Sequence, residues 1–371
     1  MINNCLVLNL KSNKEKKQKN LPENLGYIPS FDGLRAFAII LVIFSHANFQ
    51  LFGSGGIGVP VFFTLSGFLI TTLLLEEFEK NNTISFKAFY VRRTFRLFPA
   101  LYTLLLCTFI YAFFFNPMMF AKIIPEIIAS SLYVYNLSFM WQVKDVMLYH
   151  TWSLGVEEQF YLIWPVVLYI LLRYSTLKII SNFLIVFVLI FLISTSLNIF
   201  KNFTIYIIYS IFNVSIFIGC LIAILRWRGI FSFTIPVLIA ASCVLGILII
   251  GILPNRILGD FIPSIHNALY NLAGIFTGVI ILHFIYNRGG LLNRIFGNQF
   301  MVFIGKISYS LYLWHLPVFK VFAMHSTLPP RISFVSKFIV SLILALFSWY
   351  IIEKKSTLFG RNLSKKISNN I

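Results

Sequence analysis

The chain has 371 residues, of which 58% are hydrophobic and 11% are charged, whereas about 25% of the residues in a soluble protein are charged. This composition excludes an ordinary soluble enzyme and favours a polytopic membrane protein. The formal net charge of +18 therefore points to membrane lipids as partners, and we expect no nucleic-acid partner.

Ten apolar segments recur along the chain, each long enough to cross a bilayer as a helix of about 20 residues. The sequence therefore predicts an all-α, polytopic integral membrane bundle of about ten transmembrane helices. The expected membrane domain covers residues 31–353, between basic tails at residues 1–30 and 354–371. The segments are residues 33–52, 57–77, 97–116, 152–172, 179–200, 204–225, 231–252, 266–286, 302–322 and 333–352.

Lysine and arginine are concentrated on alternate flanks of these segments, and such flanks lie on the cytoplasmic side of a membrane. Because both basic tails belong to the richer set, we predict that the N- and C-termini are cytoplasmic. Residues 117–151 do not fit a simple crossing, since Pro125 and Glu126 interrupt an apolar run. We expect a re-entrant or interfacial segment there.

The first apolar segment, RAFAIILVIFSHA, begins with Arg35 and contains His46 near its end. In a helix these two side chains share nearly one face and lie roughly 16 Å apart along the axis. An ionisable residue within a membrane is a candidate functional residue, and histidine suits proton transfer near neutral pH. The alternatives are a packing role for His46 and an interfacial position for Arg35, with which Asp32 can pair.

Three arginines, Arg92, Arg93 and Arg96, precede the third apolar segment in the stretch YVRRTFRLFPALY. Arginine binds phosphate through paired N–H donors, so a pocket for a phosphorylated ligand is one interpretation. A cytoplasmic anchor is the other. The four cysteines form no CxxC pair, and we predict no metal site.

Two further polar clusters enter the apolar segments. Glu157 and Glu158 lie in TWSLGVEEQFYLIWP, although the chain has only 12 acidic residues. Adjacent helical residues point about 100° apart, so one glutamate can face a site while the other satisfies the helix start, unless both are exposed. In SYSLYLWHLPV, the spacing of Ser308, Tyr312 and His315 places them on one face, and a polar face in lipid must meet another or a water-filled cavity.

Taken together, five ordered motifs resemble the membrane-bound acyltransferase type three family, whose bacterial members O-acetylate cell-surface sugars. The first helix carries the family's Arg–His spacing, and GVPVFFTLSGFLIT, which contains Ser66, resembles its second helix. YVRRTFRLFPALY, TWSLGVEEQFYLIWP, which contains Trp152, and ISYSLYLWHLPV, which contains Tyr309, resemble three later motifs. Many relatives carry an Arg-x-Asp pair in the sixth helix, where this chain has Asn213.

The resemblance implies acetyl-coenzyme A as the acyl donor and a lipid-linked or surface glycan, such as a lipopolysaccharide O-antigen unit, as the acceptor. It implies a multi-pass protein of the bacterial inner membrane, in the stand-alone form without a periplasmic esterase-like domain. Arg93, Arg96 and Arg92 would bind the donor. His46, Glu157, Glu158 and Arg35 would be catalytic, with supporting roles for Asp32, Ser66, Trp152, Ser308, Tyr309, Tyr312 and His315.

Two mechanisms and two other protein classes stay open at this point. In direct transfer, His46 removes the proton from the sugar hydroxyl, and Glu157 or Glu158 orients or stabilises the histidine. In the second mechanism, an acyl-enzyme carries the acetyl group. A proton-coupled transporter or glycan exporter would also use intramembrane His, Glu and Arg, although no inverted repeat is evident. A membrane scaffold would not need so many polar residues in lipid.

Overall fold

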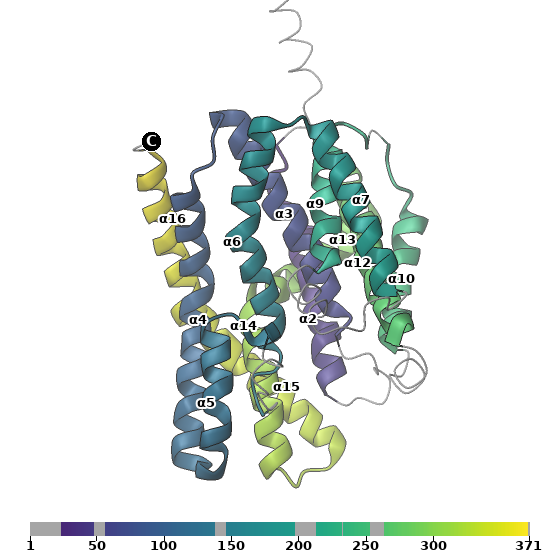
Figure 1. Ribbon diagram of the computed structural model, residues 1–371. Helices are drawn as coiled ribbons and strands as arrows, with labels where there is room; N and C mark the ends of the chain where they lie inside the picture. Colours follow the sequence, from purple (N-terminus) through teal and green to yellow (C-terminus); the bar gives the residue numbers. More distant parts are fainter. Residues whose placement is uncertain are drawn as a thin grey trace, which may run out of the picture.

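The computed structural model describes residues 24–47, 56–137, 146–196, 213–231, 233–252 and 263–369. All regular structure in these ranges is helical, and the long helices form a bundle with roughly parallel and antiparallel axes (Figure 1). The helices are α2 (Pro29–His46), α3 (Gly58–Asn81), α4 (Phe86–Phe115), α5 (Pro117–Ser131), α6 (Thr151–Tyr174), α7 (Leu177–Ser196), α9 (Val214–Trp227), α10 (Val237–Ile252), α12 (Pro263–Tyr286), α13 (Leu291–Phe296), α14 (Gln299–His325), α15 (Pro330–Phe347), the π-helical η2 (Ser348–Glu353) and α16 (Lys354–Asn369).

Each of the ten predicted apolar segments contributes a helix, which confirms the polytopic all-α class. The predicted segment 204–225 lies partly outside the described residues, and its described part is α9. Within the described ranges, seven helical stretches are long and apolar enough to cross a membrane, and α9 and α10 are shorter apolar helices. Many large apolar side chains on the outer faces are exposed, as lipid contact requires, among them Leu162, Leu189 and Leu238.

Helix α2 packs against α14 through very close backbone contact. Gly305 of α14 faces the backbone of Asp32, and Gly33 of α2 faces the backbone of Phe296, so a Cβ atom at either glycine would collide with main-chain atoms. Small residues allow such close helix approach in membranes. The two contacts fix the start of α2, and with it Arg35, beside α13 and the first turns of α14.

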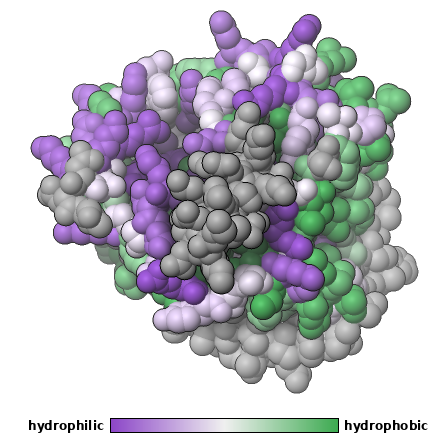
Figure 2. All heavy atoms as spheres, turned by 90° about the horizontal axis from the view of Figure 1, so that it is seen from above, coloured by the Kyte–Doolittle hydropathy of each residue, from purple (hydrophilic) through white to green (hydrophobic). Residues whose placement is uncertain are grey.

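Helix α15 continues through η2 into α16, which runs along α4 to the end of the bundle where α3 turns into α4 (Figure 1). The Ser310 hydroxyl donates a hydrogen bond of 2.7 Å to the buried Glu353 at the end of η2. Figure 2 looks onto this end and shows hydrophilic side chains gathered there, with hydrophobic ones around part of the rim. The predicted C-terminal tail is therefore helical through Asn369, while its cytoplasmic location stays a prediction.

Glu126 of α5 binds the start of the described chain before α6, within the part of the sequence for which we predict a re-entrant or interfacial segment. Its carboxylate is fully buried and accepts hydrogen bonds from the backbone N–H groups of Val146, Met147 and Leu148, at 2.6 to 2.9 Å. The Tyr135 hydroxyl donates a fourth bond of 2.9 Å. One carboxylate thus satisfies three backbone donors that regular helix geometry leaves unpaired.

Glu126→Ala is expected to lower the free energy of unfolding by at least about 3 kcal/mol, because three buried N–H groups would lose their acceptor. The measurement is thermal unfolding of the purified protein in detergent. Glu79→Ala, at an exposed position of α3, is the control and should leave the midpoint unchanged. Equal midpoints for the two variants would show that Glu126 does not hold this segment.

Candidate active site

An open cavity with about 750 Å³ of empty space lies between α2, α3, α4, α6 and α14. It gathers eight of the side chains that the sequence singled out, although these come from five helices far apart in the chain. The eight are Arg35, Ser66, Arg93, Arg96, Glu157, Ser308, Tyr309 and Tyr312. Ser153 and Tyr161 also line it. We call this space the arginine cavity.

The arginines of the cavity have different partners. Arg35 forms a salt bridge of 2.6 Å with Asp32, which confirms the predicted pair, and Asp32 also accepts a hydrogen bond of 2.8 Å from the Tyr27 hydroxyl. The guanidinium carbon of Arg93 lies 4.7 Å from the centre of the Tyr161 ring, which is a cation–π contact. Within the described ranges, Arg93 and Arg96 form no salt bridge within 4 Å.

Arg92 is not among the residues that line the cavity. Its guanidinium lies 3.8 Å from the carboxylate of Glu77, and its side chain is 40% exposed. On a helix, Arg92 and Arg93 each lie about one turn from Arg96, so spacing alone does not separate them, and only the contacts in the structure do. The structure therefore divides the three arginines into two that face the cavity and one on the outside of the bundle.

Glu157 lines the cavity and is held there by hydroxyl groups from two helices. Its carboxylate accepts short hydrogen bonds from Ser66 on α3 and from Tyr161 one turn further along α6. Ser153, Glu157 and Tyr161 are spaced by four residues, so one face of α6 supplies all three. Glu158 interacts electrostatically with Arg93 and Arg96 but does not line the cavity.

Three histidines form a second cluster beside the arginine cavity. His315 Nε2 lies 3.4 Å from His46 Nδ1, and the centres of these two rings are 5.2 Å apart. The centre of the His315 ring also lies 5.3 Å from that of His150. His315 is fully buried and His150 is 1% exposed. We call His46, His150 and His315 the histidine cluster.

Tyr312 connects the two sites. Its side chain lines the arginine cavity, and its ring centre lies 5.3 Å from that of His150 and 5.5 Å from that of His315. Its hydroxyl donates to the backbone oxygen of His150 and lies 2.7 Å from the hydroxyl of Ser153.

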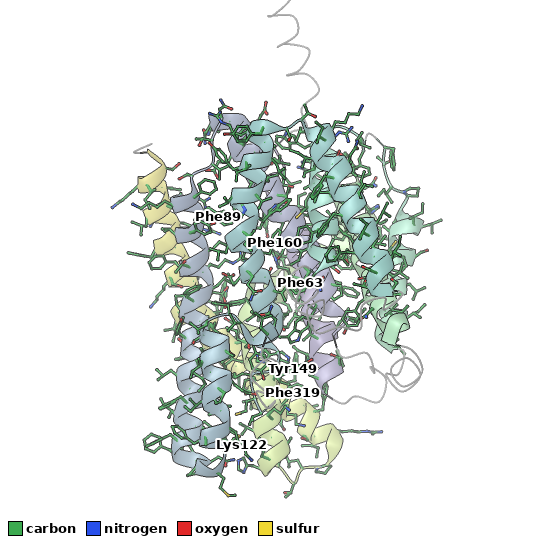
Figure 3. The ribbon with its side chains drawn as sticks, in the orientation of Figure 1. Phe63, Phe89, Lys122, Tyr149, Phe160 and Phe319 are labelled. Atoms are coloured by element: carbon green, nitrogen blue, oxygen red, sulfur yellow. The ribbon has the colours of Figure 1, made fainter. Side chains whose placement is uncertain are left out.

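The two sites lie at different depths in the bundle. Figure 3 shows the order along the bundle, with Phe89 highest, Phe63 near the middle and Phe319 lower. Phe89 contacts Arg93, Phe63 lines the cavity and Phe319 packs on His315.

Glu157 or Glu158 was predicted to orient or stabilise His46, but the structure shows other contacts for Glu157 and for His46. The hydrogen bonds of Glu157 go to Ser66 and Tyr161, while His46 lies against His315. The physical reason is that the two sites lie at different depths, with Glu157 beside the arginines in the cavity and His46 beside His315 in the histidine cluster. Trp152 packs edge-on against Phe63, with ring centres 6.3 Å apart, and does not line the cavity.

Sequence reasoning did not select His150, Ser153 or Tyr161 as site residues. Ser153 and Tyr161 could have been found from the sequence, because each lies four residues from Glu157 and so shares its helix face. His150 immediately precedes α6 and resembles an ordinary helix-end residue in the sequence. Only the packing of α14 beside this turn shows that His150 belongs to the histidine cluster.

Comparison with known proteins matches residues 28–354 to the model of the Acyl_transf_3 acyltransferase domain. The peptidoglycan O-acetyltransferase OatA of Listeria monocytogenes is 35% identical over 309 residues, which cover 79% of this chain and 49% of that protein. The O-acetyltransferase OatA of Staphylococcus aureus is 33% identical over 313 residues, or 79% of this chain and 50% of that protein.

The chain thus spans about half the length of these curated relatives. No solved structure matches it. The family model covers nearly the whole helical bundle, from the residue before α2 to the first residue of α16. It therefore includes every residue of the arginine cavity and the histidine cluster. This multi-pass membrane protein belongs to the acyltransferase 3 family.

Proposed function

We propose that the protein is a membrane O-acetyltransferase of the bacterial plasma membrane, which moves an acetyl group from acetyl-coenzyme A to a sugar hydroxyl of a cell-surface glycan. Family membership, and two bacterial relatives that are named as O-acetyltransferases, support acetyl transfer over transport or a scaffold role. The geometry supports it independently, because a basic cavity and a group of histidines lie next to each other inside the bundle.

The observation that carries the proposal is the pair Arg93 and Arg96 in the arginine cavity. Each guanidinium has five N–H donors, and within the described ranges neither group is taken up by a carboxylate within 4 Å. Donors of this kind in a cavity fit the phosphate groups of coenzyme A, which arginine binds through paired hydrogen bonds. Arg35, already paired with Asp32, lines the same cavity and can contact the phosphopantetheine of the donor.

The chemistry needs a base for the acceptor hydroxyl, and His46 is the residue we assign to it. His46 takes the hydroxyl proton while the sugar oxygen attacks the thioester carbonyl. The carbon–sulfur bond then breaks, the sugar keeps the acetyl ester, and the thiolate of coenzyme A leaves and takes the proton from the imidazolium of His46, which restores the base. Arg35 lies roughly 16 Å from His46 along the helix and lines the arginine cavity, so it can hold the phosphopantetheine of the donor. Direct transfer of this kind needs no covalent enzyme intermediate.

The acceptor is proposed at the level of a surface glycan hydroxyl. One relative is named for acetylation of peptidoglycan, which makes peptidoglycan fragments one acceptor to test. Lipopolysaccharide O-antigen units, expected from the resemblance of the sequence motifs, are the other. Both present secondary and primary sugar hydroxyls to the same reaction, so the two acceptors can be compared in one assay.

The test is a transfer assay with purified protein in liposomes and acetyl-coenzyme A labelled in its acetyl group. We expect label to appear on one of the two glycans in a protein-dependent manner, together with release of free coenzyme A. Release of neither labelled glycan nor free coenzyme A, by protein that is folded in the liposomes, would contradict the proposal. Liposomes without protein are the control for spontaneous hydrolysis of the thioester.

A further inference from the structure

The hydrogen bonds of the histidine cluster determine which ring nitrogen carries the proton. His46 Nδ1 lies 2.9 Å from the backbone oxygen of Val42, and His315 Nδ1 lies 2.6 Å from the backbone oxygen of Tyr312. A carbonyl oxygen can only accept a hydrogen bond, so both Nδ1 atoms carry the proton. In a neutral ring the other nitrogen, Nε2, then has the lone pair.

This proton placement makes the contact between the two rings directional. His315 Nε2 has a lone pair and faces the protonated Nδ1 of His46 at 3.4 Å. His46 therefore donates and His315 accepts, with the backbone oxygen of Val42 as a second acceptor for the same proton. The basic nitrogen of His46 is then Nε2, on the opposite side of its ring.

We propose that His315 is a positioning residue for the transfer reaction: as a neutral acceptor, it holds His46 with its proton on Nδ1 and stabilises the imidazolium that forms when Nε2 takes the acceptor's proton. This inference rests on the proposed function, because His46 must act as the base. The proton from the sugar hydroxyl goes to His46 Nε2, and no proton moves to His315. In a Ser-His-Asp triad a carboxylate has this position, and here a neutral imidazole occupies it.

The surroundings of His315 hold its ring in the orientation that the proposal needs. The ring is fully buried and packs against those of His150 and Phe319, with centres 5.3 and 6.1 Å away. Its Nδ1–H is bonded to the backbone of its own helix, which fixes the direction of Nε2. His150 bonds through Nε2 to the backbone oxygen of Leu313 at 3.1 Å, so its own proton points away from the pair.

The proposal predicts opposite outcomes for two amide replacements. His315→Gln can place its carbonyl oxygen where Nε2 lies, and is expected to keep most of the transfer rate. His315→Asn reaches only to the position of Nδ1, so it loses the acceptor. We expect its kcat to fall about 10- to 100-fold, the range for a hydrogen bond to a charged group, with the KM for acetyl-coenzyme A unchanged. His325→Ala, in the last turn of the same helix, is the control and should keep full activity.

A second readout does not depend on activity. The chain has six histidines, so nitrogen NMR of ¹⁵N-histidine-labelled protein in liposomes can identify the His46 signals by their loss in His46→Ala. We expect Nδ1 of His46 to be protonated in the wild-type protein, and the Nε2-protonated form to increase in His315→Asn.

Three results would overturn the proposal: a proton on Nε2 of His46 in the wild-type protein, equal losses of kcat in the Gln and Asn variants, or full activity of His315→Asn. If wild-type protein transfers no acetyl group at all, the proposed function fails. The spectra would still report whether His315 sets the proton position of His46. Failure of the function and failure of this inference are therefore distinguishable.

Discussion

Replacing His46 with alanine is expected to lower the rate of acetyl transfer about 100- to 10,000-fold, which is the usual contribution of a general base. The variant loses the only group that we assign to the hydroxyl proton, while the arginine cavity that binds the donor is unchanged. The measurement is kcat and KM for acetyl-coenzyme A in the reconstituted transfer assay. We expect the loss to lie in kcat, with KM close to the wild-type value.

Two comparisons make this result decisive. The amount of protein in the membrane and its thermal unfolding midpoint should match those of the wild type, since His46 is only partly buried at the end of α2. His325→Ala again reports on loss of a histidine outside the cluster. Retained transfer by His46→Ala would return His46 to a packing role and would remove the base from the mechanism.

Arg93→Ala and Arg92→Ala are expected to behave differently although the two residues are adjacent in α4. Arg93 lines the cavity and Arg92 pairs with Glu77 outside it. Loss of charged hydrogen bonds to phosphate is worth about 1.5–3 kcal/mol, so Arg93→Ala should raise the KM for acetyl-coenzyme A about 10- to 100-fold. Arg92→Ala should leave KM nearly unchanged, because exposed ion pairs contribute little.

A third variant, Arg93→Lys, separates charge from geometry. Lysine keeps the positive charge but lacks the planar guanidinium that binds phosphate through two parallel bonds and stacks on Tyr161. Its KM should therefore lie between the wild-type and alanine values. If Arg92→Ala raised KM as much as Arg93→Ala, the donor would bind on the outer surface of α4, and the assignment of the cavity would be wrong.

The membrane class and the positions of the helices could be predicted from the sequence, because apolar runs of sufficient length have few other structural solutions. The Arg35–Asp32 pair was predictable too, since three-residue spacing on a helix brings the side chains together. Periodicity also predicted that Ser308 and Tyr312 share a face, and the structure places both in the arginine cavity.

The contacts between helices were not predictable from periodicity, because it says which face is polar but not which helix that face meets. The close contact of Gly305 with α2 brings His315 beside His46, and no local pattern encodes that contact. The same limit explains why Glu157 or Glu158 was expected to contact His46, and why His150 was not selected as a site residue. Arg92 shows the same limit, because it lies four residues before Arg96 and helix spacing does not separate it from the two arginines that line the cavity.

The most direct test of the central claim is the fate of the labelled acetyl group in the reconstituted assay. If the arginine cavity binds acetyl-coenzyme A and His46 activates a sugar hydroxyl, the label must be recovered as an ester on the glycan. Mass spectrometry of the product should show the added acetyl group, and this product should be absent with His46→Ala. Recovery of the label only as free acetate, or an equal yield of acetylated glycan with His46→Ala, would contradict the account.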